Sequence, residues 1–176
     1  MGWKSVKDHY QIGHIVCNCD EGIAIGSSYI PKLIVIGVDG TFSTKSDLAG
    51  NSDLERYRIE MLSDMDKLLE LVRQEDSFER SIPVWTYDGS EIIEKHCEEL
   101  GFPNVTHDGW VMYDNMYFGT FEEAHSAALK NAEGWHEYSK ERVLDCQRLL
   151  EDSRQGLALW DEALCILRKG VVTTDA

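Results

Sequence analysis

The sequence predicts an α+β protein with small, mostly antiparallel sheets, one internal helix and a long C-terminal helix. Three observations predict this fold class. Short apolar runs bounded by turn residues occupy the first 50 residues and residues 82–119. An amphipathic helical pattern separates these regions at residues 52–75. A second helical pattern begins at residue 120 and continues to about residue 169.

The N-terminal apolar runs predict three strands, at residues 12–19, 22–26 and 33–38. Asp39 and Gly40 follow the third run and predict a tight turn, since glycine adopts positive φ at little cost. Residues 33–36 are apolar at every position, so we expect that strand to be buried on both faces.

The internal helix is expected to begin at Ser52 as N-cap, with Glu55 three residues later as in a capping box. Its apolar stripe contains Leu54, Met61 and Leu68, and the pattern ends near Glu75.

The second β region predicts two hairpins. Residues 84–87 and 91–97 flank Asp88 and Gly89, a favourable hairpin turn. Residues 110–113 and 116–118 are expected to pair across Asp114 and Asn115.

Thr120 and Glu123 form a second capping box, where the C-terminal helix is expected to begin. Apolar or small residues then recur at helical spacing to the end of the pattern. Gly156 lies inside it, so a single helix, straight or kinked, and a helical hairpin turning near residues 153–156 are both open. The predicted organisation is an α+β domain at 1–119, a helical arm at 120–169 and a flexible tail at 170–176.

The stripe of the C-terminal helix is longer than the internal helix that could cover it, which predicts a homodimer through coiled-coil packing. The alternative is an arm that folds back onto the sheet. The candidate dimerisation residues are Trp135, Leu157, Trp160, Leu164 and Leu167.

Composition narrows the function classes. The 176 residues include 32 acidic and 17 basic residues, a formal charge of −15, which argues against direct nucleic-acid binding through phosphates. No apolar run approaches the roughly 18 residues of a membrane span, and no signal peptide is evident. Five cysteines without a secretory signal predict reduced thiols and a cytoplasmic location.

No motif predicts catalysis or a metal, so we expect no catalytic residue, no cofactor and no metal site. Residues 34–44 resemble the first motif of haloacid-dehalogenase phosphatases, but Gly37 stands where the nucleophilic aspartate would be. His9, His14, Cys17 and Cys19 lack the spacing of a four-ligand zinc site. His107 and Asp108 could act as an acid–base pair only if a turn brought them together.

The negative charge is concentrated in the middle of the chain. Residues 52–76 carry a net charge of −4 and residues 77–119 a net charge of −6. One interpretation is solubility. The other is an acidic partner-binding face, whose candidate residues are Glu91, Glu94, Glu98, Glu99 and Asp64.

Residues 101–124 carry Asn-x-Thr-x-Asp-Gly, then Tyr-x-Asn, then Phe-x-Thr-x-x-Glu-Ala, ahead of a charged helix. This box resembles one in small uncharacterised phage and prophage proteins. The resemblance implies a phage-encoded protein that binds a host protein. We therefore expect an inhibitor of a host nucleic-acid-binding defence machine, whose acidic, DNA-mimicking surface occupies a basic groove. The alternatives are an assembly protein that oligomerises through its C-terminal helix, and a small enzyme or zinc-binding protein.

Overall fold

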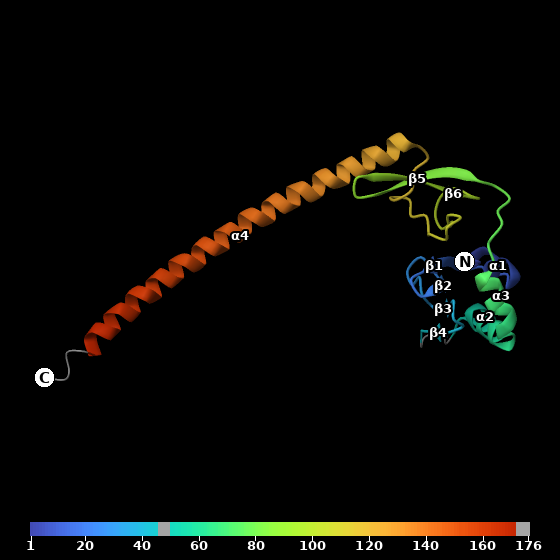
Figure 1. Cartoon of the computed structure of the whole chain (residues 1–176), viewed down its shortest axis with the longest axis horizontal. Coiled ribbons are helices and arrows are strands. Elements are labelled where there is room, and N and C mark those ends of the chain that lie inside the picture. Colours follow the sequence, from blue (N-terminus) through green and yellow to red (C-terminus); the bar gives the residue numbers. More distant parts are fainter. Residues whose placement is uncertain (46–49, 172–176) are drawn as a thin grey trace. The chain divides into compact units, whose positions relative to one another are not determined.

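The computed structural model describes residues 1–45 and 50–171 (Figure 1). It divides into two compact units, residues 1–128 and residues 129–176, and each is described here by itself. The first unit contains both sheets and the first eight residues of the C-terminal helix. The structure confirms the α+β class predicted from the sequence.

Four strands form an antiparallel sheet in the order β1-β2-β3-β4. Their bounds are β1 Ile15–Cys19, β2 Gly22–Gly26, β3 Ile34–Gly37 and β4 Phe42–Thr44. The three expected strands are present, but β1 begins at Ile15 rather than at Ile12, which is buried in the turn before it. The short β4 was not expected, and it follows the predicted turn at Asp39 and Gly40.

The fully buried strand of this sheet is β2 rather than β3. All five residues of β2 are buried, whereas Leu33 and Val35 in the β3 run are only half-buried. Gly22 and Gly26 have no room for a side chain, because a Cβ at either position would collide with a neighbouring backbone carbonyl. The expectation that residues 33–36 are buried on both faces was therefore wrong for two of its four residues.

A short helix near the N-terminus, α1 (Trp3–His9), was missed by the sequence analysis. The N-cap residue of α1 is Gly2, so no N-cap side chain accepts hydrogen bonds from the first amides of the helix. Instead the Asp76 carboxylate accepts hydrogen bonds from the Lys4 amide at 3.0 Å and from the Ser5 amide and hydroxyl, both at 2.8 Å. A cap contributed from so far along the chain leaves no local signal.

The expected internal helix is two helices, α2 (Ser52–Ser63) and α3 (Met65–Arg73). The N-cap of α2 is Asn51 rather than Ser52, because the Asn51 side chain accepts the amides of Asp53 and Leu54. Asp64 interrupts the helix with extended backbone angles, and its carboxylate accepts the Lys67 amide at 3.0 Å. The predicted stripe is nevertheless buried across both helices.

The second sheet is a hairpin of β5 (Ile82–Asp88) and β6 (Glu91–Cys97), as predicted. The second predicted hairpin, at residues 110–118, is absent from the described structure. Phe118 instead pairs with Trp85 on the outer edge of β5, and Val111 pairs with Val105. These longer-range partners satisfy the backbone groups that a local hairpin would have paired.

The C-terminal helix α4 (Phe121–Val171) is a single helix of 51 residues that passes through Gly156 without a turn. The predicted capping box is present: Thr120 Oγ1 accepts the Glu123 amide, and the Glu123 carboxylate accepts the Gly119 amide, both at 3.2 Å. Ala124 and Ala128 are buried in the first unit. Gly170 and Val171 continue the helix, and the rest of the expected tail, residues 172–176, lies outside the described residues. Across residues 1–45 and 50–171, no helix has the length and apolarity needed to cross a membrane.

The Asp64 cap generates a stability prediction. We expect Asp64→Ala to lower the free energy of unfolding by about 1 kcal/mol, because the first turn of α3 loses its side-chain acceptor. Asp64→Asn should cost far less, since asparagine caps equally well. Urea denaturation followed by tryptophan fluorescence measures both variants. An equal loss in both would attribute the effect to the charge and contradict the capping role.

Candidate functional site

The second unit carries large apolar side chains that are exposed along one helix. We call residues 129–171 the arm. A heptad repeat along the arm has two positions per repeat that face a partner helix, and these positions are alternately three and four residues apart. Twelve residues of the arm occupy such positions, and we call them the seam. The seam consists of Leu129, Ala132, His136, Ser139, Val143, Cys146, Leu150, Ser153, Leu157, Trp160, Leu164 and Leu167. Each of its side chains is exposed.

Four of the five predicted dimerisation residues lie in the seam, and they include Trp160, which is 72% exposed, and Leu164, which is 46% exposed. Trp135, which is 62% exposed, lies beside the seam instead. A heptad repeat requires alternating steps of three and four residues, but the steps from Trp135 to Ser139 and on to Val143 are both four. The repeat therefore places His136, rather than Trp135, in the seam. Four of the five predicted residues therefore share one exposed helix face, and their role in dimerisation stays a prediction.

The predicted acidic residues do not converge on one patch. Glu91 and Glu94 are an odd number of residues apart on β6, so they project from opposite faces of the hairpin. Glu94 lies 3.5 Å from His96. Asp64 belongs to the cap of α3, and Glu99 is exposed after the end of β6.

Glu98 has a structural role that the sequence did not reveal. Its carboxylate lies 3.4 Å from the Lys4 ammonium and accepts the Glu79 amide at 2.6 Å. Burial raises the pKa of Glu98, but the Glu79 amide and Lys4 more than offset this, so its pKa is lowered. Glu98 therefore joins α1 to the segment before β5 and is already paired.

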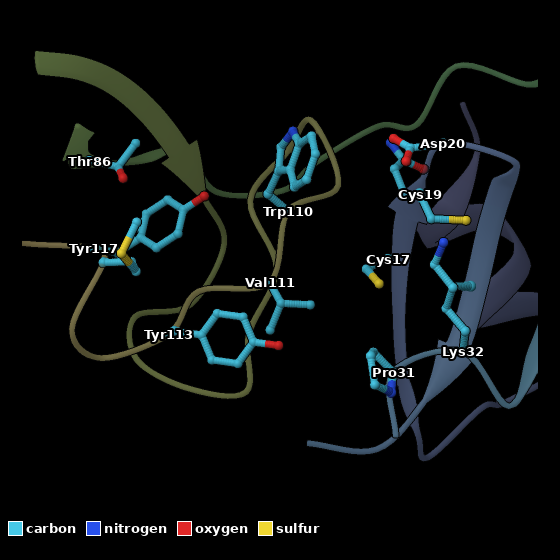
Figure 2. A pocket seen from close by; sticks show the side chains of 13 residues that line it. Cys17, Cys19, Asp20, Pro31, Lys32, Thr86, Trp110, Val111, Tyr113 and Tyr117 are labelled. Atoms are coloured by element: carbon cyan, nitrogen blue, oxygen red, sulfur yellow. The ribbon is translucent and has the colours of Figure 1, made fainter. Parts of the chain in front are cut away.

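A pocket of about 370 Å³ lies within the first unit, between the four-stranded sheet and the segment of residues 110–117. Figure 2 shows Trp110, Val111 and Tyr113 on one side, with Cys17, Cys19 and Lys32 opposite. The sequence analysis missed this pocket because it assigned the aromatic segment to a hairpin. The closely spaced aromatic residues of that segment were the one available signal.

The chemistry of the pocket favours binding over catalysis. Burial raises the pKa of both the Cys17 and the Cys19 thiol, so neither is an activated nucleophile at neutral pH. Lys32 is paired with Glu21 at 2.6 Å. Burial, with a contribution from Asp108, raises the pKa of Tyr117 to about 12. A mostly apolar concavity with unactivated polar groups suits an apolar or aromatic group.

His107 and Asp108 do not form an acid–base pair. The His107 ring stacks on Phe78 with centroids 3.8 Å apart, and its Nε2 lies 3.0 Å from the Arg80 carbonyl oxygen. Asp108 pairs with Lys95 and accepts the Thr106 hydroxyl at 2.6 Å. Within residues 1–45 and 50–171, no three histidine, cysteine or acidic side chains gather as metal ligands would.

The pairing of Asp108 generates a pH prediction. Burial raises the pKa of Asp108, but Lys95 and the Thr106 hydroxyl together lower it by more than burial raises it. The pKa of Asp108 therefore lies below its ordinary value of 3.8. A carboxyl with a lowered pKa stabilises the fold above its unfolded pKa and loses that contribution as the pH falls through the folded pKa. We expect Asp108→Asn to lower the urea midpoint at neutral pH and to approach wild type below 3.8. A difference that is constant with pH would contradict this assignment.

Comparisons with known proteins complete the description of the site. No family model, no curated protein and no solved structure matches this chain.

Proposed function

We propose that this protein is an assembly protein whose arm associates with a second copy of the chain. The observation that carries the proposal is the exposure of every seam residue along a continuous helix. Isolated helices owe little of their stability to propensity, and they are stabilised mainly by packing an apolar face. A helix with a seam of this length therefore needs a partner along the same length.

The seam has enough apolar surface for stable association. It contains five leucines, a valine and a tryptophan, all of them exposed in the single chain. Burial of these side chains against a second arm is the interaction that would hold the dimer together.

The seam generates a mutational prediction. We expect the wild-type protein to be a dimer in light scattering coupled to size-exclusion chromatography. Trp160→Glu combined with Leu164→Glu should reduce the mass to that of one chain, because burying two carboxylates in the seam is unfavourable.

A matched control carries the same change in charge on the opposite face of the helix. Arg148→Gln combined with Gln155→Glu also makes the arm more negative by two charges, at heptad positions far from the seam. This variant should remain a dimer. A wild-type protein that is already monomeric at micromolar concentration would overturn the proposal.

A second candidate function is the acidic inhibitor expected from the sequence, which would compete with nucleic acid for a basic groove on a host protein. One observation favours it. The first unit has 23 acidic and ten basic residues, a formal charge of −13, whereas residues 129–176 contribute only −2. Glu91, Glu94 and Glu99 are exposed carboxylates, and because Glu91 and Glu94 project from opposite faces of the hairpin, such a groove would have to enclose both faces.

This candidate generates a binding prediction. Glu98 must be left intact because of its contacts with Lys4 and Glu79. We expect Glu91→Lys, Glu94→Lys and Glu99→Lys together to abolish capture of host proteins from a bacterial lysate by the immobilised chain. Duplex DNA and added salt should also release captured proteins, because exposed charges are screened over about 8 Å at physiological ionic strength.

The control variant reverses three acids on the outer face of the arm: Glu141→Lys, Glu151→Lys and Glu162→Lys. It changes the net charge equally and should still capture the same proteins. If capture is unchanged by the Glu91, Glu94 and Glu99 substitutions, by DNA and by salt, the protein does not act as an acidic inhibitor of this kind.

A further inference from the structure

We propose that two arms pair antiparallel along their full length, with the two-fold axis near residue 148. This inference rests on the proposed function and specifies the orientation and register of that assembly. It follows from where large and small residues fall in the seam. In any heptad repeat the seam alternates between two positions, which are called a and d.

The two seam positions differ in size. The a positions, which begin at Leu129, hold mostly leucine and valine. The d positions, which begin at Ala132, hold small residues over most of the arm. An antiparallel pair places each a residue across from a d residue of the second copy, so large residues meet small ones. A parallel pair places a across from a, and d across from d.

The full-length register matches sizes layer by layer. With the axis near residue 148, all four small d residues meet a leucine or a valine. These layers are Ala132 with Leu164, Ser139 with Leu157, Cys146 with Leu150, and Ser153 with Val143. The remaining layers are His136 with Trp160, and Leu129 with Leu167. The indole of Trp160 thus faces the imidazole of His136 of the second copy.

The hydroxyl groups of the two seam serines already have hydrogen-bond partners within their own helix. The Ser139 hydroxyl donates to the Trp135 carbonyl at 2.7 Å, and the Ser153 hydroxyl donates to the Leu149 carbonyl at 2.8 Å. A hydroxyl that is already bonded to its own helix can be covered by leucine or valine without leaving an unsatisfied donor. In a parallel pair the same serines would face each other and leave space at two layers.

The two flanks of the seam supply an independent observation. One flank is mainly apolar or small and carries a single charge; it contains Trp135, Arg142, Leu149, Gly156 and Ala163. The other flank is polar and carries both signs of charge; it contains Glu133, Lys140, Gln147, Arg154, Asp161 and Arg168.

Orientation decides which flanks meet. In a parallel pair each flank lies against the opposite flank of the second helix, so apolar residues would face charged ones. Reversal of one helix brings like flanks together. Trp135 then lies near Ala163 of the second copy, Leu149 lies near its own equivalent, and the polar flank faces the polar flank. Reversal also places Glu133 near Asp161 and Lys140 near Arg154 of the second copy, pairs of like charge whose effect at an exposed flank is small. Size matching in the seam and contact between the two apolar flanks therefore favour the antiparallel orientation.

Distance measurement between spin labels tests the orientation. Cys165 is exposed and lies outside the seam, so it can be labelled in a Cys19→Ser, Cys146→Ser variant whose other cysteines are buried. At 1.5 Å per residue, antiparallel arms place the two labels about 50 Å apart along the axis, whereas parallel arms place them within about 25 Å. In the same background with Cys165→Ser, a label at Arg148→Cys should give a short distance in either orientation.

The expected result is a long distance at residue 165 and a short one at residue 148. A short distance at both positions, or a mixture of short and long distances at residue 165, would overturn the antiparallel register while leaving the assembly intact. Absence of any dipolar signal at residue 148, together with a monomeric mass in light scattering, would overturn the proposed assembly itself. The two failures are thereby distinguished.

Discussion

The Asp76 carboxylate holds α1 in place, and the packing of the first unit depends on that helix. Asp76 supplies the acceptors for the first amides of α1, and the Gly2 amide donates to the Val72 carbonyl at the end of α3. So anchored, α1 buries Trp3 and Val6 in the main core, and Tyr10 directly after the helix is buried there as well. The Trp3 indole also donates to the His107 carbonyl at 3.2 Å. One short helix thus joins the helix pair, the four-stranded sheet and the segment that follows β6.

Sequence patterns predicted those elements whose determinants are local. The β5–β6 hairpin follows from its turn and the start of α4 from its capping box, whereas the sequence left open whether α4 continues through Gly156. The elements that were missed depend on distant partners. The α1 helix needs Asp76, and Phe118 pairs with Trp85, which lies 33 positions earlier in the chain. The break at Asp64 was missed because its neighbours on both sides continue the same apolar stripe.

The same distinction applies to the candidate functional residues. The seam was largely predictable because every member belongs to one helix, so spacing alone places them on one face. The acidic face was less predictable because partners decide whether a carboxylate is available. Glu98 is paired with Lys4, which lies far away in sequence, whereas Glu99 beside it is exposed. The aromatic pocket was not predictable, since its walls come from β1 and from a segment about 90 residues later.

The exposure of the seam has a consequence for how the chain folds. The first unit has its own core, so its folding is unimolecular. In the proposed assembly, the arm would gain its remaining stability from association with a second copy, so the ordering of the arm would be a second-order event. Dilution would then act on the arm as a selective denaturant that spares the first unit. Under that proposal the helical content depends on the protein concentration, and circular dichroism of a dilution series reports the association constant.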